Sequence, residues 1–207
     1  MNALEACRRC TRLVSHLREL RAQYPEYHNA PVGSWGAGRP RLLIVGLAPG
    51  LHGANRTGRA FVGDSSGRTL FEALAATGWS SSADPLAASL SGARITNVAK
   101  CLPPENRPSA EEIANCGSWL QAELERFLPP ARRTPRAVLC LGTVAHHTVR
   151  RQLGLEPAAF KHGDVDAFAR RSWLFTSYHP SRQNVNTRRL TPDMLQDVLT
   201  RIRQHLY

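Results

Sequence analysis

The stretch GLAPGLHGANRTGRAFVGDSSG, residues 46–67, is the most informative part of this sequence. It directly follows the apolar run LLIV at residues 42–45, which has the length and composition of a buried strand. The stretch is rich in glycine and holds one proline, Pro49, and one carboxylate, Asp64. Glycine lets a backbone come close to another molecule, and amides at a helix start can hold an anion. We therefore expect a strand that ends in a loop suited to a flat or anionic ligand.

The loop does not match the common nucleotide-binding motifs. It lacks the G-K-[ST] ending of a P-loop, and no G-x-G-x-x-G follows the strand. We therefore do not expect a nucleotide cofactor.

The rest of the chain alternates short apolar runs with stretches of helical spacing. Further strands are expected at residues 94–98, 136–142 and 173–178, and helices at residues 5–24, 69–77, 109–127, 143–153 and 194–206. Ser109 and Glu112 form a capping-box pattern at the start of one helix. This alternation predicts an α/β fold, a three-layer α/β/α sandwich with a central, mostly parallel four-stranded sheet.

The carboxyl ends of parallel strands meet at one edge of a sheet, where ligands bind in open α/β folds. This rule places residues 46–67, 97–104 and 179–187 at the same edge. Residues 25–40, with several Gly and Pro, are expected to be an irregular connection into the sheet.

Composition predicts one domain over residues 1–207 and a polyanionic partner. The 207 residues are 42% hydrophobic, enough for one sizeable core. The net charge is +11, and all but two of the 27 basic residues are arginines, which suit phosphate through their bidentate fork. A GC-rich genome would also produce an arginine excess, so the charge alone leaves a compositional origin open.

The chain is expected to be an intracellular monomer without a membrane anchor. No apolar stretch approaches the roughly 18 to 20 residues that a bilayer span needs, and the first ten residues lack the apolar core of a signal peptide. We expect a cytoplasmic location, with the nucleoid.

Four of the five cysteines are spaced like metal ligands. Cys7 and Cys10 form C-x2-C, and Cys101 and Cys116 form C-x14-C, whereas Cys140 lies inside an apolar strand. Thiolates at such spacing in a reducing compartment can close around one metal centre. Zinc is one candidate, but the second pair is wide for a zinc knuckle, which favours an iron–sulfur cluster. Alternatively, each cysteine is a small buried apolar residue.

Three motifs resemble those of the uracil-DNA glycosylase superfamily, specifically its family 5 branch. They are GLAPGLHGANRTGRAFVGD at 46–64, TNVAKCLPP at 96–104 and HPSRQN at 179–184. The cysteine pattern is similar to the [4Fe-4S] ligand set of families 4 and 5. The resemblance implies an enzyme that hydrolyses the N-glycosidic bond of uracil in DNA, and of other deaminated bases such as hypoxanthine, leaving an abasic site. It also implies a [4Fe-4S] cluster on Cys7, Cys10, Cys101 and Cys116.

One position departs from the sister family 4, which has an acidic residue just after the first glycine of the first motif. Leu47 stands there in this chain. The resemblance suggests that Asp64, in the same loop, takes over. Because Leu47 removes a polar group, a low-turnover protein that binds uracil or abasic DNA is an alternative. A zinc-stabilised α/β domain without base chemistry is another.

Cleavage of this bond needs a flipped nucleotide, a base pocket and stabilisation of a cationic sugar and a departing base anion. Phe61 offers a stacking face, and Asn97 can present its amide to the polar edge of uracil. His179 can donate a hydrogen bond to the uracil O2 as charge develops. Asp64 can act on water and place negative charge beside the sugar.

The three motifs supply the remaining candidates. The base pocket is expected to use Gly46, Ala48, Gly50, Phe61, Asn97 and His179, and DNA to contact His52, Asn55, Arg56, Ser66, Ser181, Arg182, Gln183 and Asn184. Gly50 leaves room near the pyrimidine methyl position, which predicts tolerance of other damaged bases. Lys100 is interpreted as a phosphate contact, and neither lysine is placed to attack the sugar.

Each candidate has a structural alternative. Asp64 can simply cap the helix that begins near Ser66, Phe61 can belong to the core, and Asn97 can stabilise a turn. His179 can be structural, and the residues after it can form a solvated basic loop. The argument for a site is that all four side chains are expected at one sheet edge.

Overall fold

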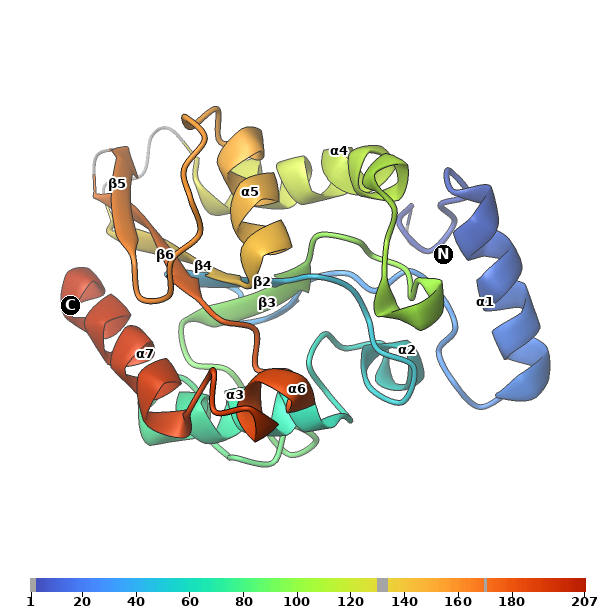
Figure 1. The fold of residues 1–207 in the computed structure, drawn as a ribbon, viewed down its shortest axis with the longest axis horizontal. Helices are drawn as coiled ribbons and strands as arrows, with labels where there is room; N and C mark the ends of the chain where they lie inside the picture. Colours follow the sequence, from blue (N-terminus) through green and yellow to red (C-terminus); the bar gives the residue numbers. More distant parts are fainter. Residues whose placement is uncertain (1–2, 130–133, 170) are drawn as a thin grey trace.

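The computed structural model describes residues 3–129, 134–169 and 171–207 as one sheet with helices on both faces (Figure 1). The strand order is β1-β3-β2-β4-β6-β5. The bounds are β1 Trp35–Gly36, β2 Leu42–Gly46, β3 Ala93–Asn97, β4 Arg136–Leu141, β5 Val165–Ala169 and β6 Ser172–Ser177. Strands β3, β2, β4 and β6 run parallel, whereas β1 and β5 pair antiparallel at the two edges. The predicted three-layer α/β/α sandwich is confirmed.

The prediction of four strands is wrong, because the described sheet has six strands. The four predicted strands are the central parallel ones, whose side chains are largely buried. β1 has only two residues, inside the segment expected to be irregular, and β5 is largely exposed. A short or half-solvated edge strand leaves little apolar pattern in a sequence, which explains why both were missed.

Two helices cover each face of the sheet. Their bounds are α1 Thr11–Gln23, α2 Ala54–Thr57, α3 Ser65–Ala76, α4 Ala110–Phe127, α5 Thr143–Gln152, α6 Arg182–Asn186 and α7 Pro192–Leu206, with a 3-10 turn at Pro104–Asn106. Figure 1 shows α4 and α5 on one face of the sheet and α3 and α7 on the other. Of the residues described, none belongs to a helix long and apolar enough to cross a membrane.

Strand β2 divides its side chains between the two cores. Leu42 and Ile44 point into the core under α3 and α7, and Leu43 and Val45 point into the core under α4 and α5. This alternation is the two-residue period of a strand that is buried on both faces. Packing on both faces holds the carboxyl end of β2, at Gly46, in the middle of the sheet edge.

The first helix begins later than predicted. The pattern predicted a helix from residue 5, but α1 starts at Thr11, and Cys10 is extended with φ −116° and ψ 100°. Cys7 and Cys10 therefore lie in a non-helical segment that precedes the helix. Arg12 ties α1 to α4 through two hydrogen bonds of 2.8 and 2.7 Å to the carboxylate of Glu112. This non-helical segment brings both cysteines beside α4.

The predicted capping box is confirmed. Ser109 Oγ accepts a hydrogen bond from the Glu112 amide at 3.1 Å, and the Ser109 amide donates to Glu112 Oε2 at 2.8 Å. Each bond satisfies an amide that an open helix end would leave unpaired. The start of α4 is thus fixed locally.

Candidate active site

A cleft opens at the sheet edge where the parallel strands end. Ala48, Gly50, Phe61, Asp64, Asn97 and His179 all line it. Asn97 is the last residue of β3, and the others come from the loops after β2 and β6, as the rule for the carboxyl ends of parallel strands predicts. The expected meeting of the three loops is therefore present in the structure.

Gly46 allows the floor of the cleft to pack tightly. A Cβ atom at this position would lie 2.5 Å from both Asn97 Oδ1 and Phe61 Cε2. Phe61 itself has φ 59° and is 7% exposed, with its ring centroid 5.6 Å from that of His179. A side chain at residue 46 would displace the aromatic ring or the amide, so glycine is required here.

Asn97 carries a buried polar atom without a partner. The residue is 2% exposed, and Oδ1 has no hydrogen bond among the described residues. The backbone oxygen of Asn97 accepts from Lys100 Nζ at 2.8 Å, which fixes the strand end. Because an unpaired buried oxygen is costly, this atom is available for a donor on a bound molecule.

His179 lies two residues beyond β6 and is held by its backbone. Asn184 Nδ2 donates to the His179 carbonyl oxygen at 2.8 Å. Burial lowers the pKa of His179 to about 4, and the negative charge of Asp64 acts in the opposite direction. The imidazole is therefore neutral at pH 7, with one ring nitrogen as donor and the other as acceptor.

Asp64 has two roles available because its two oxygens have different surroundings. Oδ1 accepts a hydrogen bond from the Gly67 amide at 2.9 Å, so the capping alternative is confirmed. Oδ2 lies against the loop after β2: a Cβ atom would come within 2.0 Å of it at Gly53 and 3.0 Å at Gly50. The carboxylate also lines the cleft. Capping and a place in the site are thus compatible.

Comparison with known proteins shows the family of this chain. The family model described as the uracil DNA glycosylase superfamily matches residues 34–203. A type-5 uracil-DNA glycosylase of Pyrobaculum aerophilum is 44% identical over 97% of this chain and 89% of its own length. The chain belongs to the type-5 branch of this superfamily. A type-5 enzyme of Thermus thermophilus is 39% identical over 96% of this chain and 93% of its own, and a type-4 enzyme of Archaeoglobus fulgidus is 30% identical over 70% and 68%.

Five of the eight candidate DNA-binding residues of this family member line the cleft. They are His52, Arg56, Ser66, Ser181 and Arg182. Gln183 is exposed on α6, outside the cleft wall.

Some of the candidates also have hydrogen-bond partners within the protein. Asn184 holds the His179 backbone, and Ser181 caps α6 by accepting from the Asn184 amide at 3.4 Å. Asn55 is fully buried and donates to Asn29 Oδ1 at 2.8 Å. The expectation that Asn55 contacts DNA is therefore corrected, because its side chain faces the interior.

The prediction that Lys100 contacts phosphate is wrong, because its side chain is buried. Its side chain is 1% exposed, and Nζ donates to Thr96 Oγ1 at 2.6 Å, Glu123 Oε2 at 2.6 Å and Asn97 O at 2.8 Å. The three donors of the ammonium are thus all used inside the protein. The sequence concealed this role because Glu123 comes from α4, far along the chain from the motif.

Sequence reasoning missed part of the cleft wall. Arg68, Asp84, Pro85, Leu86 and Asn106 line it as well. Arg68 lies near the start of α3, directly after the first motif. Residues 84–86 belong to the connection from α3 to β3, which enters a strand instead of leaving one. The strand-end rule therefore gave no signal for them.

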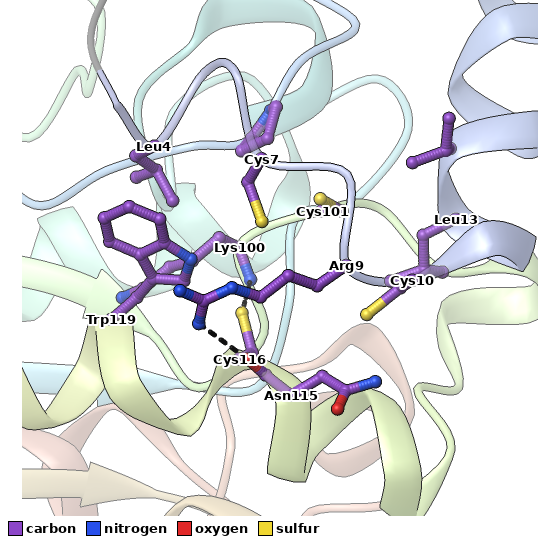
Figure 2. A pocket seen from close by; sticks show the side chains of 12 residues that line it. Leu4, Cys7, Arg9, Cys10, Leu13, Lys100, Cys101, Asn115, Cys116 and Trp119 are labelled. Atoms are coloured by element: carbon purple, nitrogen blue, oxygen red, sulfur yellow. Dashed lines mark hydrogen bonds between the residues drawn. The ribbon is translucent and has the colours of Figure 1, made fainter.

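The four predicted cysteine ligands line one pocket beside α1 and α4 (Figure 2). Figure 2 shows the sulfurs of Cys7 and Cys116 pointing toward each other, with those of Cys10 and Cys101 facing the same space. Burial raises the pKa of the Cys101 thiol to about 12, and the other three thiols add to this rise. The backbone amide of Lys100 donates to Cys116 Sγ at 3.2 Å. The prediction that the two cysteine pairs come together in space is confirmed.

The pocket is closed on one side by two side chains. The Arg9 guanidinium lies 5.2 Å from the centroid of the Trp119 ring and donates to Asn115 O at 3.4 Å.

Over residues 3–129, 134–169 and 171–207, no three His, Cys, Asp or Glu side chains gather closely enough to hold a single metal ion. By contrast, Cys140 is fully buried in β4, as expected for a structural residue.

Proposed function

We propose that this protein is a monofunctional uracil-DNA glycosylase, which hydrolyses the N-glycosidic bond of uracil in DNA and leaves an abasic site. The printed names of its type-5 relatives support this activity. The observation that carries it is the buried, unpaired Oδ1 of Asn97, beside Phe61 and His179 at the floor of the cleft. An aromatic face, an amide and a neutral imidazole are what a flipped pyrimidine requires.

Base recognition is assigned to Asn97 and Phe61. The amide of Asn97 can accept from the N3–H of uracil and donate to its O4, whereas cytosine offers the opposite pattern at these positions. The ring of Phe61 lies on the same floor and supplies a stacking surface. Rigid packing of both side chains around Gly46 keeps them in place before the base arrives.

The chemical step is assigned to Asp64 and His179. The bond between the sugar C1′ and uracil N1 breaks, its electron pair goes to uracil, and a water oxygen bonds to C1′. Asp64 accepts the proton of that water and places negative charge beside the cationic sugar. His179 donates a hydrogen bond to uracil O2 as the anion forms, and its lowered pKa keeps it a neutral donor.

Other deaminated bases such as hypoxanthine are proposed as further substrates. Gly50 lines the cleft beside Asp64 and contributes no side chain to it. The larger base of a deaminated purine needs such space. Leu47 also lines the cleft, where the sister family carries an acidic residue, so the pocket is less polar at this wall.

A [4Fe-4S] cluster on Cys7, Cys10, Cys101 and Cys116 is proposed as the cofactor. A zinc ion needs its thiolates about 2.3 Å from one centre, whereas a cubane binds one cysteine at each of four irons and so suits ligands that stand farther apart. The amide of Lys100 on Cys116 Sγ is a hydrogen bond of the kind that tunes cluster thiolates. When bound, the cluster would join the segment before α1 to α4.

We further propose that residues 1–207 form one domain that acts as a monomer in the cytoplasm, at the nucleoid. One sheet with a hydrophobic core on each face supports the single domain. The +11 charge supports a DNA partner.

The test is a single-turnover excision assay on oligonucleotides that carry uracil opposite guanine, uracil opposite adenine, uracil in a single strand, or hypoxanthine. We expect strand cleavage only after alkali, and no borohydride-trapped adduct, because Lys100 is buried and paired. Asn97→Ala, at the same fold stability, should lose most of the activity. Tight stoichiometric binding of uracil DNA without excision would instead support the low-turnover binding protein.

A further inference from the structure

We propose that Leu86 is an apolar wedge that enters duplex DNA beside the uracil site. The proposal rests on the proposed function, since it assigns a residue that helps to open the duplex. Enzymes that work on a base inside a duplex must unstack it, and apolar side chains inserted between base steps are one way to do so.

Leu86 is a large apolar residue that is exposed in the wall of the cleft. It is 57% exposed; in the described parts of the chain, the other exposed large apolar residues are Val144 at 39% and Tyr207 at 71%. Tyr207 is partnered by Arg41, whose guanidinium lies 3.9 Å from its ring centroid. A single exposed leucine needs no explanation by itself. Of these three residues, only Leu86 lines the cleft.

The turn that carries Leu86 is fixed by hydrogen bonds. The amide of Leu86 donates to Asp84 Oδ1 at 3.0 Å, and the amide of Asp84 donates to Ser82 Oγ at 3.0 Å. Across the base of the loop, the amide of Ser81 donates to the Ser89 carbonyl oxygen at 3.0 Å. These bonds hold the tip of the loop in one conformation before DNA binds.

Buried residues on both sides anchor the turn to the body. Pro85 is buried, and Ala88 and Leu90 belong to the core under α3 and α7. Leu86 therefore projects from a backbone that is packed on either side of it. A wedge must transmit force to the base stack, and a preorganised support loses little conformational entropy on binding.

Positive charge on the same cleft favours a polyanionic partner, as the proposed function requires. Arg56, Arg68 and Arg182 line the cleft together with Leu86. Arginines hold phosphates in register, and a polyanion between them would bring its bases against the apolar tip. The carboxylate of Asp84 is engaged in the turn through Oδ1.

The loop after His179 does not supply an exposed apolar residue. Its exposed members at the start of α6 are Arg182 and Gln183, which are polar. A wedge from the opposite connection, between α3 and β3, would leave Arg182 to contact phosphate or the vacated position. The two loops would then approach the lesion with different chemistry.

The experiment compares the same uracil in single-stranded DNA and opposite adenine in a duplex, by single-turnover excision. We expect Leu86→Ala to slow excision from the duplex about tenfold or more and to leave the single-strand rate within about twofold. Leu86→Met should restore most of the duplex rate, and Val144→Ala should change neither rate. Fluorescence of 2-aminopurine next to the uracil should rise less with Leu86→Ala than with wild type.

Equal loss on both substrates, or no loss on either, would overturn the wedge. Leu86 is exposed, so melting temperature should stay unchanged and report whether the variant is folded. If the wild-type protein excises uracil from neither substrate, the proposed function fails rather than the role of Leu86.

Discussion

Lys100 and Glu123 form a buried ion pair, with 2.6 Å between Nζ and Oε2 and with 1% and 12% of the two side chains exposed. Breaking such a pair leaves one charge buried without its partner, which commonly costs about 3 to 5 kcal/mol. We therefore expect Lys100→Met to lower the free energy of unfolding by about that amount in urea denaturation. Lys100→Met combined with Glu123→Gln should recover part of the loss.

The chain supplies a matched control for this prediction. Lys161 is the other lysine, and its Nζ lies 3.9 Å from Asp164 at an exposed position. Exposed pairs contribute little, so Lys161→Met should leave the unfolding curve unchanged. Similar losses for the two variants would mean that the Lys100 ion pair does not stabilise the fold.

The histidine in the cleft should not titrate near neutral pH. Burial lowers the pKa of His179 to about 4, whereas an unfolded chain protonates near its usual 6.5. The unfolded state therefore binds more protons between pH 6.5 and 4, and the contribution of His179 to stability is lost as pH falls through that window. Above pH 6.5 its contribution is constant.

Proton NMR of the His179 ring, assigned by comparison with His179→Asn, should show a midpoint below about pH 5. The single-turnover excision rate should show no protonation of this group between pH 5.5 and 8. A midpoint near 6.5 would mean that the ring is solvated and is not held as a neutral donor.

Affinity for DNA should depend strongly on salt. The +11 charge and the arginines of the cleft imply several phosphate contacts, each adding about 0.9 to the slope of log affinity against log salt. Arg182→Ala should weaken binding to all sequences alike and reduce the slope by about 1. Arg151→Ala, at an exposed position in the last turn of α5, should change neither. A slope near zero for the wild type would assign the charge to composition alone.

Iron content should distinguish Cys7, a proposed cluster ligand, from Cys140, a core residue. Protein purified without oxygen should be brown and hold about four irons per chain. Cys7→Ala should lose iron and melt at a lower temperature, because the segment before α1 loses its link to α4. Cys140→Ala should keep its iron, since that thiol is buried in β4 away from the pocket. Stoichiometric zinc without iron in the wild type would exclude the cluster.

The parts of the fold that the sequence predicts are those in which a local signal agrees with burial. The four central strands are largely apolar, and the capping box of Ser109 and Glu112 fixes the start of α4. The edge strands β1 and β5 lack such a signal because solvent, not packing, meets one side of them. The start of α1 was misplaced because Cys7 and Cys10 leave the helical path to reach a pocket formed by distant residues.

The site shows the same division. The strand ends predict that Asn97 and His179 lie at one edge of the sheet, and both residues line the cleft there. The sequence does not predict the roles of Lys100 and Asn55, because their partners, Glu123 and Asn29, are remote in sequence and come close only after folding. Leu86 lies on a connection that enters a strand, a position for which no motif and no periodicity gives a functional signal.

We propose that Asp64 acts in the chemical step as well as capping α3. Asparagine caps helices about as well as aspartate, so Asp64→Asn keeps an acceptor for the Gly67 amide and removes only the negative charge. The most direct measurement is the single-turnover excision rate of Asp64→Asn, with the melting temperature taken on the same sample. We predict a nearly unchanged melting temperature and a rate lower by two to three orders of magnitude, or about 3 to 4 kcal/mol of lost transition-state stabilisation. A normal rate in the folded variant would show that Asp64 is only a helix cap.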